Sequence, residues 1–358
     1  MTAVRAVFDG HNDALTRDDH AGIADGRSGG HLDLPRMRAG GVRGAIFAVF
    51  TPSDGGARDI PVPREDGVLE FELAPPVAHG VAAADASAAA GRLHALEQAG
   101  KVRIARRAAD LDRAVDDDGE PPVAVLHLEG AEAIDPGLEA LDLWYGAGLR
   151  SIGPVWSRPN AFAHGVPFIS PSSPDTGPGL TEAGRALVRR CGELGIVVDV
   201  SHLNEAGFWD LARLDVGPIV ASHSGVHRLC ATSRNLLDSQ LDAIGSSGGL
   251  VGIVFACPFL RADFEDDADT PISLIADHAR YVADRIGVAH VALGSDYDGA
   301  TIPAPLGDVA GTPKLLAALA DAGFNEAEVA QVAWDNWRRV LGAWWRENPA
   351  PKGAGPDA

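Results

Sequence analysis

Short apolar segments rich in β-branched residues recur along the chain, and longer amphipathic segments separate them. The run Ile196-Val197-Val198-Asp199-Val200 is an example, and its near-continuous apolar character is typical of a strand buried on both faces of a parallel sheet. Eight segments of this kind predict eight strands. They are Val4–Phe8, Arg43–Phe50, Val123–Leu128, Arg150–Val155, Ile196–Val200, Pro218–Ala221, Leu250–Phe255 and His290–Gly294.

Helices are predicted between these strands and after the last one. The alanine-rich segment 74–114 is longer than a simple crossover, so it predicts an extra helix and a short excursion around Val102–Ala105. Strands that alternate with helices predict an α/β fold, here a TIM-type (β/α)8 barrel with closing C-terminal helices. The other predicted helices are Leu138–Tyr145, Thr181–Leu194, Glu205–Leu214, Ser239–Ile244, Ile272–Ile286, Thr312–Ala322, Glu326–Val332 and Asn336–Trp345.

Length alone leaves the number of domains open, because 358 residues suit either two ordinary domains or one barrel. The eight repeats, with no low-complexity linker inside them, favour a single barrel over residues 1–347. The final segment, 348–358, is rich in proline and glycine, and we expect it to be a disordered tail.

The charge of the chain narrows the choice of partners. With 30 basic and 50 acidic residues the formal net charge is −20, which repels nucleic acids and anionic membrane surfaces. The N-terminus lacks the apolar core of a signal peptide, and no segment approaches the ~18 consecutive apolar residues of a membrane span. We therefore expect a cytoplasmic protein. The three cysteines are widely spaced and predict neither disulfides nor a thiolate metal site.

Histidine and carboxylate side chains stand at the carboxyl ends of several predicted strands, which meet at one mouth of such a barrel. His11 and Asp13, two residues apart on an extended chain, project to the same side and can reach one metal ion. His202 and His223 can share a second ion, and Glu129 can bridge the two. Any one of them alone is more often a cap or a turn residue, but five at one mouth predict a binuclear site. The set suits Zn²⁺, with Mn²⁺, Co²⁺ and Fe²⁺ as alternatives.

One loop stands out by its composition. Ser157–Gly179 directly follows the fourth predicted strand and carries five prolines together with Phe162, His164 and Phe168. Loops at that end of a barrel build active sites, so this one is either a wall for the substrate or a surface excursion stiffened by proline. The sequence leaves both readings open.

The motifs at these strand ends, taken in this order, resemble those of the membrane (renal) dipeptidase family of zinc metallopeptidases, which are amidohydrolase-like. The likeness extends over essentially the whole chain. It rests on Asp9-Gly10-His11-Asn12-Asp13, Leu128-Glu129-Gly130, Val198-Asp199-Val200-Ser201-His202, Ala221-Ser222-His223-Ser224, Ser233-Arg234-Asn235, Gly294-Ser295-Asp296-Tyr297-Asp298-Gly299 and Trp334-Asp335-Asn336-Trp337-Arg338-Arg339-Val340-Leu341.

The resemblance implies a barrel enzyme that cleaves dipeptides with two zinc ions per subunit. His11 and Asp13 would hold one ion, His202 and His223 would hold the other, and Glu129 would bridge them. A hydroxide held between the two ions would then attack the peptide bond, without a nucleophile from the protein. The family's tolerance of D-residues at the second position adds L-Xaa-D-Xaa dipeptides to the expected substrates.

Two further residues take their roles from the resemblance. Arg234 matches the family arginine that binds the free carboxylate of the substrate, a role for which the guanidinium fork is suited. Asp296 matches the aspartate that handles the proton. Asp296 and the bridging Glu129 are therefore the implied catalytic residues.

The chain departs from the family at a position that bears on the substrate. Many members have a histidine just after the fourth strand, where this chain has Trp156. Either His164 takes over in substrate binding, or oxyanion stabilisation falls wholly to the metal. Trp156 and the aromatic loop also leave an alternative function open, that of a metal-dependent amidase acting on N-acyl amino acids or β-lactams. The family often forms homodimers, and Trp344-Trp345 would either serve such a contact or close the barrel.

Overall fold

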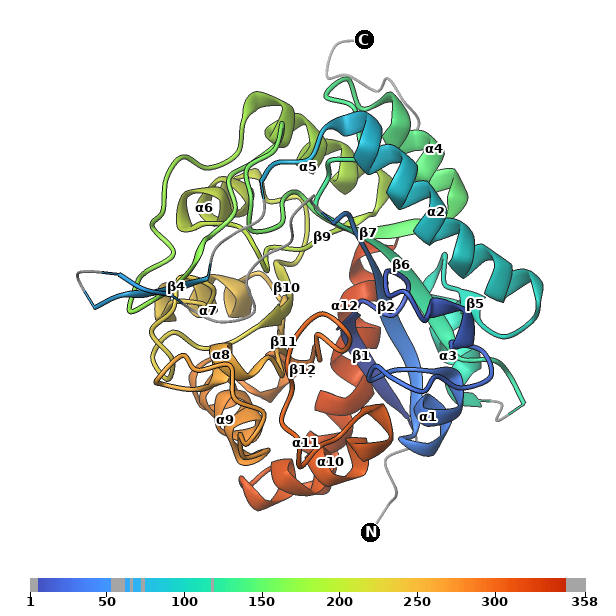
Figure 1. The fold of residues 1–358 in the computed structure, drawn as a ribbon, viewed down its shortest axis with the longest axis vertical. Coiled ribbons are helices and arrows are strands. Elements are labelled where there is room, and N and C mark those ends of the chain that lie inside the picture. Colours follow the sequence, from blue (N-terminus) through green and yellow to red (C-terminus); the bar gives the residue numbers. More distant parts are fainter. Residues whose placement is uncertain (1–5, 53–61, 65–66, 72–74, 117–118, 346–358) are drawn as a thin grey trace.

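The computed structural model describes residues 6–52, 62–64, 67–71, 75–116 and 119–345. Its centre is a ring of eight parallel strands surrounded by helices, the predicted α/β barrel (Figure 1). The predicted domain limit at residue 347 and the tail 348–358 lie outside the described residues. The ring consists of β1 (Val7–Asn12), β2 (Val42–Phe50), β6 (Val123–Glu129), β7 (Leu149–Gly153), β9 (Val197–Val198), β10 (Val220–Ser224), β11 (Leu250–Ile253) and β12 (Val291–Leu293).

Two ladders of hydrogen bonds make up the ring. One runs in the order β1, β2, β6, β7, β9, and the other in the order β10, β11, β12. Isolated bridges join the ladders, Asp199 with Val220 on one side and Asn12 with Tyr297 on the other. The N–H of Val200 also donates to the carbonyl of Val220 at 2.9 Å. We call these two junctions the β9–β10 seam and the β12–β1 seam.

The strand boundaries differ from the predicted ones at the ends that carry polar residues. β1 continues through His11 and Asn12, and β10 continues through Ser222 and His223 to Ser224. Both strands are buried along their whole length. Polar residues would be expected to end a buried strand, but these side chains face one another at the mouth or have buried partners, so the strand extends through them.

Helices cover the outside of the ring (Figure 1). The extra helix and excursion predicted for 74–114 are confirmed as α2 (His79–Gln98) and β5 (Arg103–Ile104), which pairs with the start of β6, and a second helix that was not predicted, α3 (Ala108–Asp116), follows them. Among the described helices, none combines the length and the apolar character needed to cross a bilayer. The other predicted helices are confirmed within a few residues as α4 (Glu139–Ala147), α5 (Glu182–Leu194), α6 (Glu205–Leu214), α7 (Asp238–Ser246), α9 (Ser273–Ile286), α10 (Thr312–Asp321), α11 (Glu326–Ala330) and α12 (Asn336–Trp344).

Several short elements were not predicted. They are the helices α1 (Leu34–Ala39) and α8 (Cys257–Leu260) and a three-stranded antiparallel sheet of β3 (Val62–Pro63), β4 (Leu69–Phe71) and β8 (Phe168–Ser170). Because β8 lies within the proline-rich loop 157–179, this loop is anchored to a segment nearly a hundred residues earlier in the chain. Strands of two or three residues are too short to show a hydrophobic period.

α12 lies across the amino-terminal ends of the barrel strands. The side-chain amide of Asn336 donates to the carbonyl of Val291 at 2.7 Å, where β12 begins. The indole N–H of Trp344 donates to the carbonyl of Pro218, ahead of β10, at 2.9 Å, and Trp345 is buried beside it. The Trp344-Trp345 pair therefore closes the barrel.

Trp337 extends this closure deeper into the molecule. Its side chain is fully buried, and its indole N–H donates to the carbonyl of Leu293 at 2.9 Å. A Cβ atom at Gly10 would collide with the Trp337 ring, so glycine is required in the middle of β1. A π-helical turn, Gln331–Asp335, links α11 to α12 and ends just before Trp337 in the sequence.

Candidate active site

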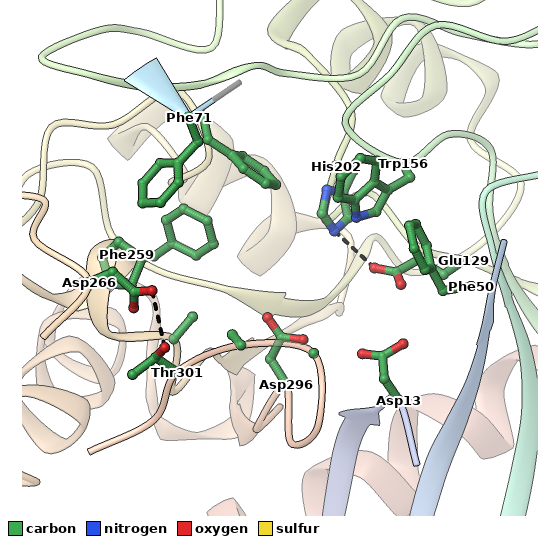
Figure 2. A pocket seen from close by; sticks show the side chains of 15 residues that line it. Asp13, Phe50, Phe71, Glu129, Trp156, His202, Phe259, Asp266, Asp296 and Thr301 are labelled. Carbon is green, nitrogen blue, oxygen red and sulfur yellow. Dashed lines mark hydrogen bonds and ion pairs between the residues drawn. The ribbon is translucent and has the colours of Figure 1, made fainter. Parts of the chain in front are cut away.

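A cavity of about 200 Å³ opens at the carboxyl ends of the barrel strands (Figure 2). Four carboxylates line it, and most of the remaining lining is apolar. The carboxylates belong to Asp13, Glu129, Asp266 and Asp296, and the aromatic part of the wall consists of Phe50, Phe71, Trp156, Phe168 and Phe259. The cavity therefore combines a group of carboxylates with a largely apolar, aromatic wall.

Glu129, the last residue of β6, is the point at which the predicted metal ligands meet. Its Oε1 atom lies 3.0 Å from Nε2 of His202 and 3.5 Å from Nε2 of both His11 and His223. The same Nε2 atom of His11 lies 3.6 Å from Oδ2 of Asp13. None of these five side chains is more than 9 % exposed. The fold thus brings together all five residues that the sequence analysis grouped.

A chain of hydrogen bonds orients the imidazole of His223. Asp199 accepts the hydroxyl of Ser222 at 2.5 Å, so the Ser222 oxygen is left to accept Nδ1–H of His223 at 2.7 Å. In this tautomer the lone pair of Nε2 faces Glu129. Burial, together with the charges of His11 and Arg234, lowers the pKa of His223 well below its usual value, which keeps the ring neutral. Such partners behind a histidine are typical of metal sites.

His202 is held in a similar way. The hydroxyl of Ser157 lies 2.8 Å from its Nδ1, and its Nε2 lies 3.1 Å from Nε2 of His223. Burial and the charge of Arg234 lower the pKa of His202 to about 4. Two neutral imidazoles therefore direct their Nε2 atoms to nearly the same point, which is an arrangement that suits a shared metal ion.

His11 gives the clearest test of whether a metal fits. Both of its ring nitrogens are buried, and neither has a hydrogen-bond partner among the described residues. Leaving such a group unpaired costs about 1–3 kcal/mol, and a metal bond would remove that cost at one nitrogen. Potential ligand atoms of His11, Glu129 and His223 all lie within 4.8 Å of one another, and so do those of His11, Asp13 and Asp296. The donor set therefore fits bound cations.

Asp13 and Asp296 approach the centre from opposite sides of the β12–β1 seam. A Cβ atom at Gly299 would collide with a carboxylate oxygen of each, so a larger residue there would displace these carboxylates. Burial and the charge of Glu129 raise the pKa of Asp13 to about 7. Burial is also the main cause that raises the pKa of Asp296. Crowded carboxylates of this kind are stabilised by a cation.

Arg234 lies beside the ligand imidazoles, outside the described lining of the cavity. Its guanidinium donates to Oγ of Ser224 at 2.9 Å and to the carbonyl of His223 at 2.8 Å, and Nη2 lies 3.1 Å from Nε2 of His202. Its buried Nε has no partner among the described residues. Burial lowers its pKa to about 10, so the group stays positively charged at neutral pH. It places a buried guanidinium cation next to the metal ligands.

Of the two other residues predicted to bind substrate, the structure brings only Trp156 to the cavity. Its ring packs against those of Phe50 and Phe168, with centroids 5.0 and 5.7 Å away. His164 is outside the described lining, and its Nδ1 lies 3.4 Å from the carbonyl of Gly179. The geometry therefore does not favour His164 as the replacement for the family histidine, and its role in substrate binding stays a prediction.

Residues that the sequence analysis did not assign also build the cavity. Phe71 comes from the small antiparallel sheet, and Asp266 and Thr301 come from the loops after α8 and β12. Ser157 and Ser222, which hold the imidazoles, were quoted only as parts of longer segments. For the loop residues the only signal was general, namely that loops at this end of a barrel surround the active site.

Comparison with known proteins shows what the chain resembles. The profile described as Membrane dipeptidase (Peptidase family M19) matches residues 2–348. A crystal structure of a metallopeptidase from Rhodobacter sphaeroides, liganded with a phosphinate mimic of the dipeptide L-Ala-D-Ala, is 43% identical, with a TM-score of 0.88 over 95% of this chain and 99% of that one. The crystal structure of dipeptidase AC, a metallopeptidase of family M19, is 44% identical, with a TM-score of 0.87 over 95% and 98% of the two chains.

The chain is also similar to a bacterial protein that is described by the position of its gene. A protein in the pqqA 5′ region of Klebsiella pneumoniae is 47% identical over 249 residues, which are 70% of this chain and 91% of that protein.

Proposed function

The chain belongs to the membrane dipeptidase family, peptidase family M19, and is a metallo-dipeptidase, and we propose that it hydrolyses dipeptides, including L-Xaa-D-Xaa dipeptides, with two zinc ions per subunit. The observation that carries this proposal is the convergence of three imidazole nitrogens on one oxygen of Glu129, each within 3.5 Å. The relative from Rhodobacter sphaeroides, liganded with a mimic of L-Ala-D-Ala, supports the L,D stereochemistry.

The ligands divide into two sets around Glu129. His11 and Asp13 would hold one ion, His202 and His223 would hold the other, and Glu129 would bridge them. Nitrogen and oxygen donors without a thiolate are a set that zinc accepts. Zinc bound there would lower the pKa of a water molecule towards ~7 and polarise the carbonyl of the scissile bond.

We assign proton transfer to Asp296. It lines the cavity beside Asp13, and burial raises its pKa above that of an exposed aspartate. Its carboxylate would accept a proton from the attacking water and then deliver it to the leaving amine. Glu129 would keep its negative charge, because the imidazoles around it outweigh burial and hold its pKa well below the usual value.

Arg234 would bind the free carboxylate of the dipeptide. Its positive charge lies beside His202, and its buried Nε has no hydrogen-bond partner among the described residues. A longer peptide would bring a neutral amide to this cation, so the enzyme would select dipeptides. Trp156 would form part of the wall that keeps water from the reacting bond.

Metal removal tests the proposal directly. Exhaustive chelation should abolish hydrolysis of Ala-D-Ala, zinc should restore it, and metal analysis should find two ions per chain. Glu129→Gln should lower activity by about 100-fold or more and reduce the bound metal, since it removes the charge that would bridge the ions. Full activity after complete metal removal would contradict the proposal.

The aromatic wall favours one alternative, an amidase that acts on N-acyl amino acids or β-lactams. Turnover of Ala-D-Ala and of its N-acetylated form separates the two functions. We expect the free dipeptide to be preferred, and a strong preference for the blocked compound would replace the dipeptidase proposal with the amidase.

Arg234→Ala should act on the C-terminal end of the substrate. We expect KM for Ala-D-Ala to rise about 100-fold, because a charged hydrogen-bonded pair is lost. The C-terminal amide of the same dipeptide lacks the carboxylate and should be affected little. Equal effects on both compounds would assign Arg234 to the support of His202 instead.

A further inference from the structure

The cavity has a far end that the proposed reaction does not use. Figure 2 shows Asp266 and Thr301 on one side, Asp13 and Glu129 on the other, and Asp296 between them. All five residues line the same cavity. The same lining includes the apolar residues Ala256, Pro258, Phe259 and Ala300. Asp266 thus adds a carboxylate to an apolar surface away from the metal ligands.

A hydrogen bond orients the carboxylate of Asp266. The hydroxyl of Thr301 donates to its Oδ2 at 3.1 Å. The two residues come from different loops, and the N–H of Ala304 ties these loops together by donating to the carbonyl of Ala268 at 2.8 Å. The carboxylate is therefore held in place before any substrate arrives, which lowers the entropy cost of binding.

An aromatic anchor also fixes the loop that carries Asp266. Phe264 is fully buried, and its ring lies 5.3 Å from that of Phe71 and 6.4 Å from that of Phe259. Its backbone has a φ of 61°, a conformation that a phenylalanine adopts only where packing over-determines it. The rings of Phe71 and Phe259 form part of the cavity wall, so the loop packs directly against this wall.

We propose that Asp266, oriented by Thr301, forms a subsite for a cationic side chain of the dipeptide, such as that of lysine. This subsite rests on the proposed dipeptidase function. The α-ammonium group is attached next to the scissile carbonyl, so it stays near the metal end, whereas a long side chain can reach the far end. Its methylene groups would lie along Phe259 and the neighbouring apolar wall, and its charge would meet Asp266 where water is partly excluded.

Four dipeptides test this subsite: Lys-D-Ala, Ala-D-Lys, Ala-D-Ala, and norleucyl-D-Ala, which matches lysine in length but lacks the charge. With Asp266→Asn, kcat/KM for at least one lysine dipeptide should fall about 10-fold, mainly through KM, because one partner of an ion pair is lost. The values for norleucyl-D-Ala and Ala-D-Ala should stay within about 2-fold. The lysine dipeptide that responds identifies which substrate residue occupies the subsite.

Glu265→Gln is the matched control, since it removes the same charge from the adjacent residue. The Glu265 side chain is 64% exposed and outside the described lining, so this change should leave all four substrates unaffected. Asp266→Lys should reverse the preference and favour Glu-D-Ala over Lys-D-Ala, a result that misfolding cannot mimic.

Equal changes for lysine, norleucine and alanine substrates in Asp266→Asn would overturn the subsite. Hydrolysis of Ala-D-Ala by the wild-type enzyme tests the dipeptidase function separately. If it is retained, equal changes for all four substrates in Asp266→Asn contradict only the subsite, whereas an enzyme that hydrolyses none of the four contradicts both.

Discussion

The two seams of the barrel are built alike but differ in how well they support a negative charge. At the β9–β10 seam, Asp199 accepts the N–H and hydroxyl of both Ser201 and Ser222, at 2.5–3.1 Å. At the β12–β1 seam, Asp9 accepts the N–H and hydroxyl of Ser295, both at 2.8 Å, and a longer bond of 3.4 Å from the N–H of His11. Each aspartate thus bridges strands where the backbone ladders stop.

The difference shows in the pKa of each carboxylate. Both groups are buried, and burial alone raises the pKa of an acid. For Asp9 burial dominates and raises the pKa to about 6. For Asp199 burial is outweighed by His127 and by the donors from Ser201 and Ser222, and the pKa falls below its usual value. Two buried carboxylates therefore have opposite pKa shifts, and the charge of His127 together with the donated hydrogen bonds lowers that of Asp199.

The largest predicted effect is on the free energy of unfolding, when the charge of the aspartate at a seam is removed. Asp199→Asn leaves two hydroxyls and two N–H groups facing an amide, so the free energy of unfolding should fall by about 4 kcal/mol. Asp9→Asn should cost only about 1 kcal/mol, since that carboxylate is held less well. Urea unfolding of the two zinc-loaded variants measures the contrast. Equal losses would show that the two seams are equivalent.

A fall in pH should lower the free energy of unfolding through a buried histidine beside β10. His278 of α9 is buried, accepts the N–H of Val226 just after β10 at 3.0 Å, and has a pKa lowered by burial to about 4. The unfolded chain binds this proton from about pH 6.5 downward, whereas the folded protein does so only near pH 4. The free energy of unfolding should therefore decrease by about 3 kcal/mol as the pH falls from 6.5 to 4.

His278→Gln is the control for this pH effect. It lacks the titrating group, so its unfolding free energy should depend less steeply on pH between 6.5 and 4, even if the variant is less stable at pH 7. An unchanged slope would mean that the acid sensitivity arises from other groups, such as the seam carboxylates.

The smallest predicted effect is on zinc affinity, when the serine hydroxyls that bond to the two seam aspartates are removed. Ser222→Ala removes the group that links Asp199 to Nδ1 of His223, so zinc affinity should fall about 10-fold. Ser295→Ala removes a donor to Asp9 that makes no contact with a ligand imidazole in the described structure, and its zinc affinity should change by less than about 3-fold. Competition with a chromogenic chelator measures both values.

Much of the fold could be predicted because its signals are local. Eight apolar runs and the helices between them follow from side-chain period alone, and α6 begins and ends where it was predicted. The metal ligands could be grouped because strand ends of a barrel converge. The extension of β1 and β10 through polar residues could not be foreseen, since it depends on partners such as Ser295 and Asp199, which follow other strands, β12 and β9.

The cavity wall was harder to predict than the metal centre. Phe71 and Phe168 meet through strands of three residues that no periodicity reveals. Asp266 lies in an acidic loop where several carboxylates look equivalent in sequence, and only its hydrogen bond with Thr301 and its place in the lining distinguish it. His164 has the right residue type in a suitable loop, but the fold turns it towards Gly179. Contacts between distant loops carry no local signal.

The position of Trp337 has a consequence for the order in which the chain is made. Its indole fills the space left by Gly10 and bonds to the end of β12, so residues from the first and the last strands depend on a helix near the C-terminus. A ribosome synthesises β1 long before α12. The amino-terminal end of the barrel, and with it the final position of the strand that carries His11, can therefore form only after α12 has been synthesised.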